Sequence, residues 1–122
     1  ELSRVMLSLK SLLSKNTGLP TIIFDEIDSG VSGEVADKVG QILAGMGRYM
    51  QVVNITHLPQ VAARGKRHYH VYKDESGNET ITCIKLLSAD ERITEVARLL
   101  SGSEITDTAV RNAKELIKAA RQ

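Results

Sequence analysis

The stretch TIIFDEIDSGVSG, residues Thr21–Gly33, decides the fold. It opens on four residues of mostly β-branched or aromatic character, then runs into the adjacent carboxylates of Asp25 and Glu26 and a loop rich in glycine and serine. An apolar run this short is typical of a strand buried on both faces, as in a parallel sheet. Such sheets bind ligands beyond the carboxyl ends of their strands, which is where the two acids fall. Two neighbouring acids at that edge indicate a magnesium-nucleotide site.

The segment after this loop predicts a helix and then a second strand. Ser32 is the expected N-cap, and the expected core face of the helix carries apolar residues at helical spacing, namely Val35, Ala36, Val39, Ile42, Leu43 and Met46. The apolar stretch 51–56 is the expected second strand. A strand, a helix and a strand at this spacing form a βαβ unit with parallel strands.

The flanking segments predict more helices and one hairpin. Residues 2–14 carry an apolar stripe at helical spacing, and 69–73 and 80–86 alternate like strands around a polar turn. A capping box at 88–91 opens a further helix, and the last helix begins near Thr106. The whole chain, 1–122, is thus expected to be one α/β unit. It would have a small, mostly parallel sheet, a peripheral hairpin and C-terminal helices.

Composition excludes several classes of protein. The 16 Lys and Arg nearly balance the 15 Asp and Glu, so the net charge of +1 gives no electrostatic case for nucleic-acid binding by this segment alone. The single cysteine, Cys83, excludes a disulfide framework and favours a reducing, cytoplasmic setting. No apolar run approaches the roughly 18 residues of a membrane-spanning helix, so no membrane role is expected. Because Glu1 already lies within a helical pattern, we expect the chain to be a piece of a larger protein.

His57 follows the second strand and falls at the same sheet edge as Asp25 and Glu26. An imidazole there could donate a hydrogen bond to a terminal phosphate. Taken singly, each feature has a simpler interpretation: Asp25 could cap the turn, Glu26 could be solvated, and His57 could be a turn residue. Their convergence on one edge favours the chemical interpretation. His68 and His70 share one strand face without an evident carboxylate partner, which favours a solvated face over a metal pair.

The motifs together resemble the ATPase heads of the ABC superfamily. Residues 21–26 look like a Walker B strand, Asp28 begins what looks like a D-loop, His57 looks like the switch histidine, and ELSR at 1–4 resembles the tail of the signature motif. Within the superfamily the chain resembles a bacterial family of DNA double-strand-break repair proteins related to the SMC proteins. The strings that carry this likeness are IIFDEIDSGVSG at 22–33, ITHLPQVAA at 55–63 and ERITEVARLLSG at 91–102.

The resemblance implies a role for each of these residues. Asp25 would coordinate Mg²⁺, Glu26 would orient or deprotonate the hydrolytic water, and His57 would contact the γ-phosphate of ATP. Asp28 would communicate across a dimer of heads. Phosphoryl transfer needs mainly positioning and charge neutralisation, so this sparse set of residues is chemically sufficient on its side of the site.

The resemblance also implies partners. Ser3 and Arg4, in the signature-like tail, would approach the nucleotide held between two heads of a homodimer. DNA would be engaged by the complete protein, placing it in the bacterial cytoplasm at the nucleoid. The 122 residues contain no Gly-x-x-x-x-Gly-Lys-Ser/Thr phosphate loop, Q-loop or coiled-coil arm. We expect these parts upstream in the complete protein, which would include the N-terminal lobe of the same head, and we expect this segment alone to be inactive. The alternative is a non-catalytic interaction or dimerisation module derived from the same fold.

Overall fold

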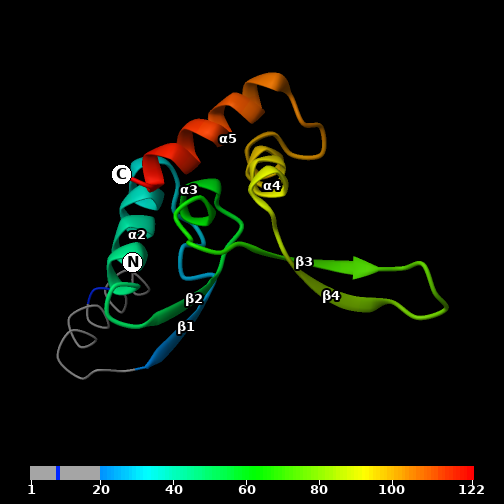
Figure 1. Cartoon of the computed structure of the whole chain (residues 1–122), viewed down its shortest axis with the longest axis horizontal. Coiled ribbons are helices and arrows are strands. Elements are labelled where there is room, and N and C mark those ends of the chain that lie inside the picture. The colour runs from blue at the N-terminus through cyan, green and yellow to red at the C-terminus, as the bar shows by residue number, and fades with distance from the viewer. Residues whose placement is uncertain (1–7, 9–19) are drawn as a thin grey trace.

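The computed structural model describes residue 8 and residues 20–122, and its elements follow the predicted order (Figure 1). Most of the helix expected over 2–14 lies outside the described residues, as do Ser3 and Arg4. The elements are β1 (Thr21–Asp25), α2 (Gly33–Met46), β2 (Gln51–Ile55), α3 (Pro59–Ala62), β3 (Tyr69–Asp74), β4 (Ile81–Leu86), α4 (Ala89–Ser101) and α5 (Asp107–Ala120).

The predicted βαβ unit is present. Strands β1 and β2 pair in parallel, with Thr21 opposite Gln51 and Asp25 opposite Ile55, and α2 connects them. In the described part of the chain this pair is one of two separate two-stranded sheets, the other being the antiparallel β3–β4 hairpin. Of the expected small, mostly parallel sheet, the described residues contain only this two-stranded pair.

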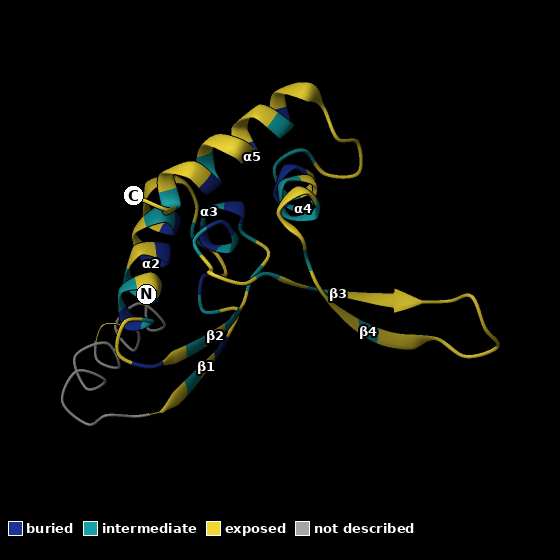
Figure 2. Cartoon of the chain, in the orientation of Figure 1, coloured by how far each residue is buried: buried dark blue, intermediate teal, exposed yellow. Residues whose placement is uncertain are grey.

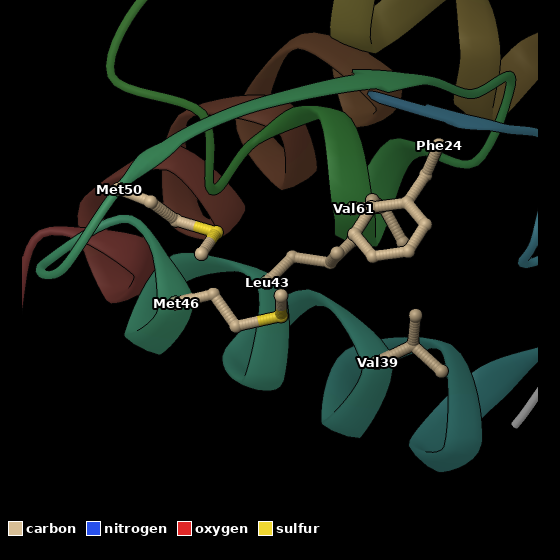
Figure 3. Packing of buried hydrophobic residues seen from close by; sticks show 6 residues of the cluster. All are labelled: Phe24, Val39, Leu43, Met46, Met50 and Val61. Carbon is tan, nitrogen blue, oxygen red and sulfur yellow. The ribbon is translucent and has the colours of Figure 1, made fainter. Parts of the chain in front are cut away.

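One face of the parallel pair forms a core with α2 and α3. Phe24 of β1 packs into a cluster with Leu43 of α2 and Val61 of α3, and methionines from the end of α2 and the following turn close the cluster (Figure 3). The buried members are Phe24, Val39, Leu43, Met46, Met50 and Val61. Burying large apolar side chains such as these contributes about 1.5–3 kcal/mol each, so this cluster holds the two strands against the helices.

The prediction that β1 is buried on both faces is wrong for the described chain. Ile23 is 66% exposed, and Val53 and Ile55 on β2 are 41% and 51% exposed. Both strands carry segments in the colour of exposed residues in Figure 2. Successive side chains on a strand point to opposite faces, so Phe24 enters the core while Ile23 faces away from it. The described helices α2 and α3 pack on one face of the pair and leave the other face open.

Two details of α2 also differ from the prediction. Ser32 occupies the N-cap position, but its side chain makes no capping hydrogen bond; its carbonyl oxygen instead accepts from the backbone N–H of Ala36 at 3.4 Å. Val35, expected on the core face, is exposed, whereas Ala36 is fully buried. The buried face of α2 therefore begins one residue later than the apolar pattern indicates.

Helices α4 and α5 pack on each other around a second apolar cluster, and α5 lies across the top of α3 and α4 in Figure 1. The predicted capping box is confirmed: Ser88 Oγ accepts from the N–H of Glu91 at 3.3 Å, and Glu91 Oε1 accepts from the N–H of Ser88 at 3.4 Å. Thr106 caps α5 with its side chain alone, which accepts from the N–H of Ala109 at 3.1 Å. Both helix starts follow directly from the local sequence.

The β3–β4 hairpin extends away from the helices (Figures 1 and 2). One of its faces meets α4 through polar groups: His70 Nδ1 lies 3.4 Å from Glu95 Oε1, and Lys85 Nζ lies 2.5 Å from Glu91 Oε2. The opposite face presents four exposed apolar residues, Tyr69, Val71, Ile84 and Leu86. The expectation that His70 lacks a carboxylate partner is wrong, because Glu95 comes from a helix distant in sequence.

Within the described residues, no helix combines the length and the apolar character needed to cross a membrane.

Candidate functional site

The carboxyl ends of β1 and β2 bring Glu26 and His57 together. The backbone N–H of Glu26 donates to the carbonyl of Ile55 at 2.9 Å, so the two strand segments stay paired one residue beyond β1. His57 Nδ1 then lies 3.7 Å from Glu26 Oε1, and both side chains are more than half exposed. The structure thus places these two predicted residues side by side at the predicted edge, where solvent or a ligand can reach them.

The backbone at Glu26 has an unusual conformation. Its φ of 50° makes it the one non-glycine residue with a positive φ among those described. A residue with a Cβ atom in this left-handed region costs on the order of 1 kcal/mol, and such residues cluster at functional sites. The turn that follows is closed by the N–H of Ser29, which donates to the carbonyl of Glu26 at 3.1 Å. Gly30 and Gly33 supply the further positive φ values, 80° and 56°, that lead the loop into α2.

Asp25 lies at the end of β1 on the open face of the sheet and is exposed. Strand alternation directs its side chain away from the core that Phe24 enters, while the left-handed turn at Glu26 redirects the next carboxylate towards His57. The side chains of the two adjacent acids therefore point in different directions, as the alternation of side chains along a strand predicts.

Asp28 is fully buried, which its sequence position does not reveal. Its Oδ2 accepts a hydrogen bond from the hydroxyl of Thr56, and the Thr56 Oγ1 in turn accepts from the N–H of Leu58 at 3.1 Å. Among the described residues no group hydrogen-bonds to Asp28 Oδ1. The predicted communication of Asp28 across a dimer stays a prediction; the structure places its carboxylate in the interior of the fold. Sequence reasoning missed Thr56, although a hydroxyl residue directly before the histidine at a strand end was a usable signal.

Helix α3 follows His57 and is held at its far end by two arginines. Arg92 of α4 donates from Nη2 to the carbonyls of Ala62, Ala63 and Gly65, at 3.2, 2.7 and 2.5 Å. Arginine suits this position because its guanidinium presents several fixed donors to the carbonyls left free at a helix C-terminus. Burial lowers the pKa of Arg92 from its ordinary value, and the charge of Arg121 adds to that effect.

The second arginine joins the end of α3 to α2. Arg64 donates from Nη2 and Nε to Asp37 Oδ1 at 2.7 and 3.1 Å. The hydrogen bonds from Arg64 are the main cause that lowers the pKa of the Asp37 carboxyl. The segment that carries His57 is thus fixed to α2 and to α4 as well as to β1.

The described residues contain no cluster of three or more His, Cys, Asp or Glu side chains that could hold a metal ion by themselves. Mg²⁺ differs from zinc or calcium in this respect, because it keeps waters and phosphate oxygens and needs only one or two carboxylates from the protein. An exposed carboxylate at a strand end, as at Asp25, fits that requirement.

Comparison with known proteins defines the class and then the family. The chain matches no protein-family model. A solved structure from a study of ATP-driven dimerization and DNA-stimulated activation of SMC ATPases matches with a TM-score of 0.66, at 15% identity, over 84% of this chain and 61% of that one. The chain therefore has an α/β fold of the ABC/SMC ATPase type.

The DNA repair protein RecN of Bacillus subtilis is 45% identical over 122 residues, which is all of this chain but 21% of that protein. RecN of Haemophilus influenzae is 45% identical and RecN of Rickettsia conorii 48% identical, each over 96% of this chain and 21% and 22% of their own lengths. The chain corresponds to the C-terminal part of RecN and spans about one fifth of these relatives.

Proposed function

We propose that this chain is the C-terminal lobe of an ATP-hydrolysing head that acts in recombinational repair of DNA double-strand breaks. The observation that carries the proposal is the pairing of Glu26 with His57, 3.7 Å apart at the carboxyl edge of the parallel pair. Its setting supports the assignment, because the relatives are named as DNA repair proteins and the fold is shared with SMC ATPases.

Each residue has a distinct task in this proposal. Asp25 would hold Mg²⁺, which neutralises charge on the phosphates of bound ATP. Glu26, more than half exposed, would accept a hydrogen bond from the attacking water and orient it. His57 faces Glu26 with Nδ1, which leaves Nε2 as the ring nitrogen for an oxygen of the terminal phosphate.

The rest of the site would come from other parts of the complete protein and from its dimer partner. The 122 residues contain no phosphate loop, so an N-terminal lobe would supply it, and a second head would close the site as a homodimer. Ser3 and Arg4 would then approach the nucleotide. The exposed apolar side chains of Ile23, Val53 and Ile55 support a further layer on the open face of the sheet. DNA binding would belong to the complete protein, in the bacterial cytoplasm at the nucleoid.

The segment alone should bind ATP weakly or not at all and should be inactive, because it has no cradle for the phosphates. Isothermal titration of the 122-residue chain with Mg-ATP tests this expectation. If the full-length protein contains no phosphate loop in its remaining sequence, the ATPase assignment fails and the non-catalytic interaction module replaces it.

A substitution of Glu26 by Gln in the full-length protein tests the central assignment. The amide keeps the size of the side chain but accepts protons poorly, so we expect retained ATP binding, a stabilised head dimer and hydrolysis slower by about 10²-fold or more. Glu34→Gln is the matched control, since Glu34 is an exposed acid on α2 whose carboxylate pairs with its helix neighbour Lys38 at 3.0 Å. Near-normal turnover in Glu26→Gln would rule out the role given to this residue.

A further inference from the structure

We infer that Asp28 is a positioning residue that acts through Thr56 to hold His57 against Glu26 within one head. The inference rests on the proposed function, because it concerns the arrangement of the two groups assigned to catalysis there. It adds a role inside the head for a carboxylate that the sequence pattern places at the start of a D-loop.

Asp28 and Thr56 lie close in sequence to the two candidate catalytic residues. Asp28 follows Glu26 by two residues, and Thr56 directly precedes His57. The hydrogen bond from the Thr56 hydroxyl to Asp28 Oδ2 therefore joins the loop after β1 to the loop after β2. Together with the backbone bond from Glu26 N–H to the Ile55 carbonyl, it joins the two loops at two points, one at Glu26 itself and one directly before His57.

The Thr56 hydroxyl both donates and accepts a hydrogen bond. It has a single proton, which it donates to Asp28, and its oxygen accepts from the N–H of Leu58 at 3.1 Å. His57 is the residue between these two attachment points, so its backbone is fixed on both sides. A side chain whose backbone is fixed in this way needs less reorganisation when substrate arrives.

Burial of Asp28 strengthens its hydrogen bond with Thr56. Asp28 is 0% exposed, and a hydrogen bond to a carboxylate shielded from water is stronger than one at the surface. No described residue hydrogen-bonds to its other oxygen, Oδ1, and an unpartnered buried carboxylate oxygen lowers stability. A buried acid at this position is therefore poorly explained by stability alone, and a role in aligning the site accounts for it.

The decisive experiment is a double-mutant cycle in the full-length protein. Thr56→Val removes the donated proton and keeps the shape of the side chain, and Thr56→Ser keeps the hydroxyl. We expect Thr56→Val to lower kcat by about 10- to 100-fold, as for misplacement of a catalytic group, with KM for ATP changed by less than about 2-fold. Thr56→Ser should restore most of the rate. In a His57→Ala background, Thr56→Val should cause no further loss in single-turnover hydrolysis.

The outcomes separate the inference from the proposed function. A loss of the same factor in the wild-type and His57→Ala backgrounds, or normal turnover in Thr56→Val, would overturn the positioning role. Absence of ATP hydrolysis by the unsubstituted full-length protein would instead overturn the proposed function. If Thr56→Val fails to fold, Asp28→Asn probes the same link: its amide oxygen accepts more weakly, so a smaller loss of about 3-fold is expected, again absent without His57. A loss that persists without His57 would count against the inference here too.

Discussion

Replacing Arg92 with Met should loosen the attachment of α3 to α4. Met keeps most of the unbranched stem but has no donor for the carbonyls of Ala62, Ala63 and Gly65, which Arg92 Nη2 contacts at 2.5–3.2 Å. One nitrogen carries two protons, so these contacts amount to about two charge-assisted hydrogen bonds of about 1.5 kcal/mol each. Partial desolvation of the guanidinium, which also lowers its pKa, offsets part of this gain. The expected loss is about 2 kcal/mol in the free energy of unfolding.

Urea denaturation of the 122-residue chain, followed by far-UV circular dichroism, measures this loss. Arg111→Met is the matched control, because Arg111 lies exposed on α5 and its replacement should change stability by less than about 0.5 kcal/mol. Hydrogen exchange gives a local readout, since amides of residues 59–65 should exchange faster in Arg92→Met than in the control. Equal stability and equal exchange in the two variants would show that Arg92 does not hold α3 in place.

Three further predictions concern stability. Ser88→Ala removes the side-chain half of the capping box and should cost about 1 kcal/mol, seen as a lower melting temperature. Gly40→Ala should destabilise α2, because the added Cβ would lie 2.8 Å from Cδ of Arg64, whereas Gly45→Ala in the same helix meets nothing within 4 Å and should stabilise by up to about 1 kcal/mol; equal effects would contradict this. Burial lowers the pKa of His68 below 6.5, so the unfolded chain takes up this proton first and the free energy of unfolding should fall as pH drops below 6.5. Urea titrations at several pH values should show a flatter profile for His68→Gln, and an unchanged slope would count against it.

The sequence was sufficient for the elements that depend on local patterns. The apolar runs of β1 and β2, the capping box at Ser88 and the alternation in the hairpin all have the expected place in the structure. The convergence of Glu26 and His57 could also be predicted, because parallel strands end at a common edge. This prediction needed only the rule that ligands bind beyond the carboxyl ends of parallel strands, and it did not depend on any particular side-chain contact.

The contacts that hold the site in place were not predictable in this way. The bonds from Thr56 to Asp28 and from Arg92 to the end of α3 join residues 27–30 positions apart, and no local periodicity reports such pairs. The open face of the sheet was missed for a related reason. An apolar strand sequence indicates which side chains avoid water, but it does not say which part of a protein covers them.

The left-handed backbone at Glu26 places stability and chemistry in opposition at one position. Glycine adopts a φ of 50° without the steric cost that any other residue meets there, so Glu26→Gly should relax the turn while removing the carboxylate. A selection for thermal resistance alone would therefore favour a sequence that has lost its proposed general base. An acid is retained at this turn only if variants are also selected for their rate of ATP hydrolysis. Engineering of this lobe for higher thermal stability should therefore leave Glu26 unchanged.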